Sequence, residues 1–280
     1  MKFTTEQKIH YTLRIAAAMC FIGHGSFGII TKEVWTNYFA VFGISHDLSF
    51  RLMPLLGALD IFLGLIILFY PLRIALLWLV AWSLITALLR PLSGEPFAEF
   101  IERAGNFGAP LALLLYSGNF TVNIKTLFRP VTPNVAANVK GLQQLIACLR
   151  IIVFLLFLGH GWLNLIEKKS LVNQYLSLGF INAGTTAQMI GLFEITGAVA
   201  ILIRPLRSVV LVFLVWKAGS ELFYPHYEIF EWIERGGSYG ALLALWLALD
   251  CLPAFQRSNL LFRNKLMKAY SRTNGKDYTK

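Results

Sequence analysis

Two stretches of the chain decide its fold: Glu99-Phe-Ile-Glu-Arg-Ala-Gly-Asn-Phe-Gly-Ala109 and Glu231-Trp-Ile-Glu-Arg-Gly-Gly-Ser-Tyr-Gly-Ala241. Seven of their eleven positions are identical. Upstream, Gly23-His-Gly25 recurs as Gly159-His-Gly161, and Pro71-Leu-Arg73 recurs as Pro205-Leu-Arg207. The separation between matching positions falls only from 136 to 132 residues along the chain. Such a pattern is typical of a duplicated unit whose loops differ slightly in length.

The composition is that of a membrane protein. Hydrophobic residues make up 56% of the 280 positions and charged residues 14%, whereas a soluble domain carries about 25% charged residues. A transmembrane helix needs about 20 mostly apolar residues. On that basis we predict an all-α integral membrane protein with eight spans, at 13–31, 53–70, 74–90, 104–118, 147–166, 187–203, 208–224 and 237–253.

The duplication sets the expected topology. Each unit has four spans, so both units begin on the same side of the membrane, as two parallel repeats related by a pseudo-twofold axis along the membrane normal. We expect the first repeat at 1–118, a cytoplasmic linker at 119–146, the second repeat at 147–253 and a basic cytoplasmic tail at 254–280. In the outer loops at 32–50 and 167–186, apolar residues at helical spacing favour short interfacial helices.

The distribution of the net charge of +10 indicates how the chain is oriented in the membrane. Of the 25 Lys and Arg residues, 17 lie on the predicted loops and tails that share a side with the N-terminus, and 7 lie on the opposite side. Because Lys and Arg favour the cytoplasmic side, we expect a multi-pass protein of the cell inner (plasma) membrane with both termini cytoplasmic. The expected partner of the basic surface is the lipid bilayer, and no nucleic acid is expected.

Five ionisable residues lie at one predicted depth, in the outer half of the membrane. They are His24, Asp60, His160, Glu194 and Lys217, about 9–12 Å from the outer ends of their spans at 1.5 Å per residue. Ionisable residues inside a bilayer are costly and usually face the interior of the bundle. We predict that His24 pairs with Asp60 and His160 with Glu194. Such pairs are compatible with proton transfer, because histidine titrates near neutral pH, and also with a purely structural role.

A second group of polar residues is predicted to lie near this layer and to hold a ligand. Lys217 and Glu221 are spaced to pair with each other, and their counterparts in the first repeat, Ser83 and Ala87, carry no charge. Structural clamping is the alternative role for the Glu-Arg pairs. The predicted ligand-binding residues are Lys217, Glu221, Arg90, Glu102, Arg103, Glu234 and Arg235.

The sequence carries no pattern typical of a metal site. The three cysteines, Cys20, Cys148 and Cys251, have no metal-ligand spacing. A haem b held between His24 and His160 is a further alternative, because two histidines at equal depth can ligate one iron axially.

The repeated unit resembles the DoxX/DoxD-like family of four-helix membrane proteins. The likeness lies in the Arg-led first span that ends in Gly-His-Gly (Arg14 to Gly25 and Arg150 to Gly161), in the Gly-x-x-Asp/Glu of the second span, and in the arginine that opens the third. The resemblance implies a membrane component of a redox system, with quinone as a possible cofactor and a redox subunit as a possible partner. A membrane oxidoreductase component is thus one hypothesis, and a small-solute transporter and a non-catalytic scaffold subunit are the alternatives.

Overall fold

The computed structural model describes residues 3–118, 124–133, 139–222 and 229–251. This part of the chain is helical, apart from its loops and one isolated bridge between Leu72 and Pro130. The long helices are α1 (Thr5–Ile29), α3 (His46–Phe69), α4 (Arg73–Leu92), α6 (Ala104–Tyr116), α8 (Val139–Leu165), α10 (Ala183–Ile203), α11 (Arg207–Leu222) and an unlabelled helix, Gly236–Cys251. The short ones are α2 (Trp35–Ala40), α5 (Phe97–Glu102), α7 (Ile124–Leu127), α9 (Lys169–Ser177) and α12 (Ile229–Glu234).

Five of the long helices have the length and hydropathy needed to cross a membrane. They are α1, α3, α4, α8 from Lys140 onward, and α10. Helices α6, α11 and Gly236–Cys251 lie at the other predicted spans but are shorter. Several apolar helices of this length are consistent with a multi-pass membrane protein.

Several helices begin earlier than the hydropathy predicted. Helix α1 begins at Thr5 because Thr4 and Gln7 form a capping box. Helix α8 begins at Val139, so residues 139–146 of the predicted linker are helical, with Leu142 and Leu145 buried in the core. The predicted tail at 254–280 lies outside the described residues. The Pro-Leu-Arg links form tight connections, from α3 to α4 and from α10 to α11.

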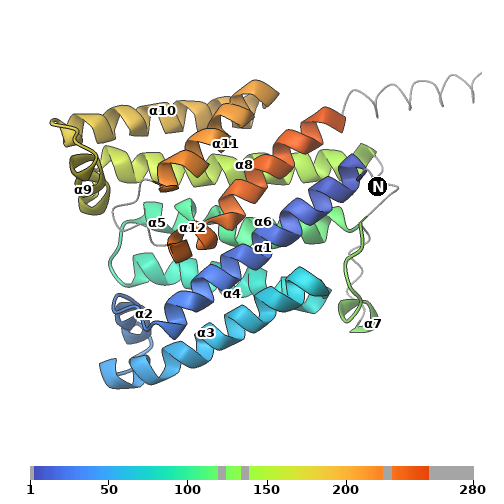
Figure 1. Cartoon of the computed structure of the whole chain (residues 1–280), viewed down its shortest axis with the longest axis horizontal. Coiled ribbons are helices and arrows are strands. Elements are labelled where there is room, and N and C mark those ends of the chain that lie inside the picture. The colour runs from blue at the N-terminus through green and yellow to red at the C-terminus, as the bar shows by residue number, and fades with distance from the viewer. Residues whose placement is uncertain (1–2, 119–123, 134–138, 223–228, 252–280) are drawn as a thin grey trace, which may run out of the picture.

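Matching helices pack in matching ways (Figure 1). Helix α1 lies along α3, α8 lies along α10, and α6 contacts both α1 and α8. Gly25 and Gly57 approach so closely that a Cβ on either would strike the other's carbonyl oxygen, and Gly161 and Gly191 meet in the same way. Small residues allow such close helix contact. Arg14 Nε donates to the Ile67 carbonyl at 3.0 Å, which satisfies a free carbonyl near the end of α3.

Two short helices cross from one half of the chain to the other. Helix α12 lies against α1, and α5 lies against α8. Gly23 leaves no room for a Cβ beside the backbone of Glu234, and Gly159 leaves none beside the backbone of Glu102. In Figure 1, α2, α5, α9 and α12 lie toward one end of the bundle, and the N-terminus and α7 lie at the other. We call these the α2/α9 end and the N-terminal end.

The fourth helical segment of each half is broken by one residue. Arg103 separates α5 from α6, and Arg235 separates α12 from Gly236–Cys251. The sequence analysis did not predict these breaks or the six-residue helices α5 and α12. These breaks place Arg103 beside Glu234 and Arg235 beside Glu102, so that each arginine meets a glutamate of the other half.

Candidate functional site

The two predicted His–carboxylate pairs are present. His24 Nδ1 lies 2.7 Å from Asp60 Oδ2, and His160 Nδ1 lies 2.6 Å from Glu194 Oε2. Each pair joins the first long helix of its half to the second. An indole stands beside each carboxylate, with Trp82 Nε1 3.4 Å from Asp60 Oδ2 and Trp216 Nε1 2.9 Å from Glu194 Oε1.

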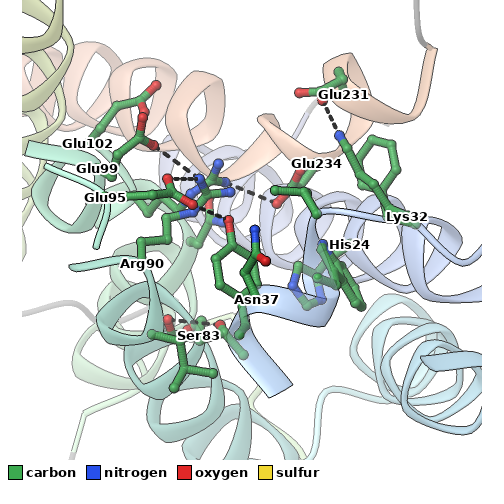
Figure 2. Close-up of a pocket in the computed structure, with 18 of the residues that line it drawn as sticks. His24, Lys32, Asn37, Ser83, Arg90, Glu95, Glu99, Glu102, Glu231 and Glu234 are labelled. Atoms are coloured by element: carbon green, nitrogen blue, oxygen red, sulfur yellow. Dashed lines mark hydrogen bonds and ion pairs between the residues drawn. The ribbon is translucent and has the colours of Figure 1, made fainter. Parts of the chain in front are cut away.

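The first pair borders a large cavity, which we call the first-half cavity. It has a volume of about 1000 Å³ and combines polar residues with an apolar wall that includes Trp35 and Phe39. Figure 2 shows Arg90, Glu95 and Glu99 on one side of it, and His24 and Lys32 on the other. A cavity of this size and mixed lining is typical of a site for a small molecule.

Asp60 Oδ1 and Arg103 Nε belong to residues that line the first-half cavity. Both atoms are buried and have no hydrogen-bond partner in the described part of the chain. A buried polar atom without a partner costs free energy, so these two atoms are candidate contacts for a bound molecule.

The second pair borders a smaller cavity of about 500 Å³, the second-half cavity. Eight of its lining residues match lining residues of the first-half cavity at the repeat offset: His160, Gln174, Tyr175, Leu178, Phe180, Ile190, Trp216 and Ser220 match His24, Tyr38, Phe39, Phe42, Ile44, Leu56, Trp82 and Thr86. His160 also reaches the wall of the first-half cavity.

The second pair is covered by protein groups. Asn164 Nδ2 lies 3.3 Å from His160 Nδ1 and 3.4 Å from Glu194 Oε2, and Tyr175 donates its hydroxyl to Asn164 Oδ1 at 2.7 Å. Gly28 stands where Asn164 would be in the first half. Here His24 stacks against Trp35 instead, with ring centroids 4.6 Å apart.

A buried chain of charges runs through the second half. Lys217 Nζ lies 2.5 Å from Glu221 Oε1, as the sequence predicted. Glu221 Oε2 lies 3.7 Å from Arg235 Nε, and Arg235 also pairs with Glu102. Lys217 is fully buried, and alternation of sign along the chain compensates for the burial of each charge.

Four ion pairs join the two halves reciprocally. Arg103 pairs with Glu234 at 3.2 Å, and Arg235 pairs with Glu102. At the rim, Lys32 pairs with Glu231 at 2.6 Å, and Lys168 pairs with Glu99. In each case the residue at the matching position makes the matching contact in the other half. This is the pattern of an interface with a twofold axis.

Arg90 is neutralised by carboxylates of the first half. It lies 2.9 Å from Glu95 and 3.1 Å from Glu99 (Figure 2). Tyr38 donates to Glu95 at 2.6 Å. Burial raises the pKa of the Tyr38 hydroxyl, and the bond to Glu95 adds to this effect although Arg90 opposes it. Tyr38 is therefore a donor throughout the physiological pH range.

Two of the crossing carboxylates stay ionised. Burial alone would raise the pKa of Glu102, but Arg235, His160 and Lys217 hold it well below the usual glutamate range. Burial opposes ionisation of Glu234 too, and Arg103 is the strongest of the charges that lower its pKa. The Glu-Arg pairs that join the two halves are therefore ionised at neutral pH.

Nine of the eleven predicted site residues line one of these two cavities. The other two, Glu194 and Lys217, line neither and pair with the lining residues His160 and Glu221. What the sequence analysis missed is the exchange of partners between the halves, and the parts played by Lys32, Lys168, Glu99 and Glu231. All four belong to the repeat pattern, so a search for opposite charges at matching positions would have found them. Within the described ranges, no group of three or more His, Cys, Asp or Glu residues is arranged to hold a metal ion. The haem alternative stays a prediction.

Comparison with known proteins returned no match to a family model, a curated protein or a solved structure. The resemblance to DoxX/DoxD-like proteins therefore stays an expectation from the sequence. The class that the fold defines is an all-helical protein with five candidate membrane-spanning helices. Its distinguishing feature is a large cavity bordered by a His–carboxylate pair.

Proposed function

We propose that the chain is an eight-span inner-membrane protein made of two parallel four-helix repeats, with the N-terminal end cytoplasmic and the α2/α9 end outside. The reciprocal ion pairs and the matched helix contacts support the repeat. The excess of Lys and Arg on the N-terminal side supports the orientation.

We propose further that the first-half cavity binds a small amphiphilic ligand and exchanges a proton with it through His24 and Asp60. The observation that carries this proposal is the 2.7 Å contact between His24 Nδ1 and Asp60 Oδ2 at the wall of a cavity of about 1000 Å³. A carboxylate on Nδ1 orients the ring and leaves Nε2 to accept or donate a proton. Asp60 Oδ1, which is buried and has no hydrogen-bond partner within the described ranges, is a second acceptor.

A quinone-linked redox role is the specific form of this proposal that the resemblance implies. Reduction of a quinone takes up protons, which a His–carboxylate pair can supply. The electrons would come from a partner subunit, because the protein's own part in such chemistry is binding, orientation and electrostatics.

Transport of a small solute is the second candidate. It is favoured by the helix breaks at Arg103 and Arg235, since broken helices form the binding sites of many secondary transporters.

The test is ligand binding by the purified chain in lipid nanodiscs, followed by the fluorescence of Trp35 and Trp82, which line the cavity. The probe is a short-chain quinone, titrated across a range of pH. We expect His24→Gln and Asp60→Asn each to weaken binding and to flatten its pH dependence. The matched variants His160→Gln and Glu194→Gln are expected to have smaller effects. Equal effects in both halves would contradict the proposal, and no binding by the wild type would leave the scaffold role.

A further inference from the structure

The second half contains a carboxylate that the first half lacks. Glu221 lies beside Arg235 and Lys217, and it lines the second-half cavity together with His160. The matching position in the first half is Ala87, and Ser83 stands in the place of Lys217. The Ser83 hydroxyl is occupied, because it donates to the Leu79 carbonyl at 2.6 Å.

The missing carboxylate leaves Arg103 with fewer partners than its counterpart. Arg235 faces Glu102 from the other half and Glu221 from its own half. Arg103 faces Glu234 from the other half, and its buried Nε has no hydrogen-bond partner among the described residues. Arg103 lines the first-half cavity and its side chain is 12% exposed, so the residue borders a space large enough for a ligand.

The other cations around the first-half cavity are already paired. Arg90 is held by Glu95 and Glu99, and Lys32 by Glu231. Lys168 pairs with Glu99, and Arg235, which also lines this cavity, pairs with Glu102 and lies beside Glu221. Arg103 is therefore the cation on this wall best placed to bind an anion, since its guanidinium can hold a second carboxylate in addition to Glu234.

We propose that the ligand of the first-half cavity carries a carboxylate, which binds Arg103 beside His24 in the place that Glu221 takes in the second half. This inference rests on the proposed function of the same cavity and specifies the class of its ligand as a small amphiphilic carboxylic acid. The apolar wall, with Trp35, Phe39 and Leu56, receives the hydrocarbon part of the ligand. In the second half, Glu221 is paired with Lys217 and supplies the carboxylate beside Arg235, so no ligand is needed there.

The first test compares octanoate with octanol, which share a chain length and differ in charge. Binding to the full chain in nanodiscs is measured by tryptophan fluorescence, with empty nanodiscs as the blank. A charge-assisted hydrogen bond at a buried site predicts that octanoate binds about ten- to a hundredfold more tightly than octanol. We expect Arg103→Gln/Glu234→Gln, which removes the cation and its carboxylate partner together, to bring octanoate to the affinity of octanol.

The matched control is Arg207→Gln/Asp250→Asn, which removes an exposed ion pair between the start of α11 and the end of the helix Gly236–Cys251. It should leave both affinities unchanged. Equal affinities of wild type for octanoate and octanol, or an equal loss of both in the Arg103 variant, would overturn the carboxylate proposal and leave the cavity as a binding site. If neither compound nor the quinone binds, the proposed function itself fails.

A second variant tests the same idea in the other half. Lys217→Ser/Glu221→Ala gives the second half the residues of the first. It therefore removes the Glu221 carboxylate from beside Arg235 and enlarges the second-half cavity. Calorimetric titration of the folded variant should then show two octanoate sites per chain where the wild type shows one. An unchanged stoichiometry in a variant with the wild-type helical content would mean that Glu221 does not stand in the place of a ligand.

Discussion

The two His–carboxylate pairs are built from matching residues, yet their surroundings differ. Around His160 and Glu194, both carboxylate oxygens have protein donors, with Trp216 on one and His160 and Asn164 on the other. Around His24 and Asp60, one carboxylate oxygen is buried without a hydrogen-bond partner among the described residues, and the neighbouring cavity is about twice as large. The second half supplies donors to both oxygens of its pair's carboxylate, whereas in the first half Asp60 Oδ1 has no donor among the described residues.

This difference indicates how a duplicated unit can divide two tasks. The second half has two buried polar groups that the first half lacks. Asn164 and Tyr175 cover the His160–Glu194 pair, and Lys217 and Glu221 form a chain of ion pairs that continues through Arg235 to Glu102 of the other half. The first half, with small or apolar residues at those positions, keeps the space for a ligand. The following predictions test this division of tasks.

The largest expected effect is at the two arginines that break the fourth segments. Arg235→Gln deprives two buried carboxylates, Glu102 and Glu221, of a partner and should lower the free energy of unfolding by about 4 kcal/mol. The matched variant Arg103→Gln deprives Glu234 alone and should cost about 3 kcal/mol. Denaturant unfolding in mild detergent, followed by circular dichroism, compares the two. A larger loss for Arg103→Gln would contradict the view that the ion pairs of Arg235 with Glu102 and Glu221 stabilise the protein more than the pair of Arg103 with Glu234.

Lys217 provides a comparison within the third segments. Lys217→Met keeps much of the volume but leaves Glu221 without its closest cation, so we expect a loss of about 2–3 kcal/mol in unfolding free energy. The matched variant Ser83→Ala removes only a bond to its own helix and should change stability by less than about 0.5 kcal/mol. Both are measured by thermal and denaturant unfolding of the purified chain. If the two variants are equally mild, Lys217 is not part of a stabilising network.

The sequence was sufficient to locate the eight long helices and to pair His24 with Asp60 and His160 with Glu194. Apolar runs, the repeat and equal depth along the helices specify these features. The sequence analysis did not predict that Arg103 pairs with Glu234 rather than with its neighbour Glu102. Which carboxylate an arginine meets depends on how α5 and α12 cross between the halves, and packing at Gly23 and Gly159 decides that crossing. The sequence analysis also did not predict the difference in size between the two cavities. That difference depends on the folded positions of Asn164 and Tyr175 relative to His160.

Acid should weaken the contact between the halves. The pKa values of Glu102 and Glu234 are lowered in the folded chain, so the unfolded chain binds more protons at mildly acid pH. The stabilisation is therefore fully present above the ordinary glutamate pKa of about 4.3 and is lost as the pH falls below it. Unfolding measured down this range should be less pH-dependent in Glu102→Gln than in wild type. The exposed variant Glu33→Gln serves as the control and should keep the wild-type dependence.

The hydroxyl of Tyr175 should have a moderate effect. Tyr175→Phe removes the donor to Asn164 Oδ1 and leaves that buried oxygen unpaired, at an expected cost of about 1 kcal/mol in unfolding free energy. The first half already has phenylalanine at the matching position, Phe39. As a control, the exposed Tyr70→Phe should be neutral. A neutral Tyr175→Phe would mean that the cover over His160 contributes no stability.

The smallest expected effects are at the rim, where the two crossing lysines are equally exposed but their partners are not. The side chains of Lys32 and Lys168 are both 32% exposed, whereas Glu99, the partner of Lys168, is 1% exposed and Glu231, the partner of Lys32, is 17% exposed. An ion pair with one buried member is less screened by solvent and salt. Lys168→Met should therefore cost up to about 1 kcal/mol in unfolding free energy, and Lys32→Met less than about 0.5 kcal/mol. Repeating both measurements in high salt should reduce the smaller effect first. If Lys32→Met proved the more costly, the burial of the partner carboxylate would not set the strength of these contacts, and Lys32 would need another role at the mouth of the first-half cavity.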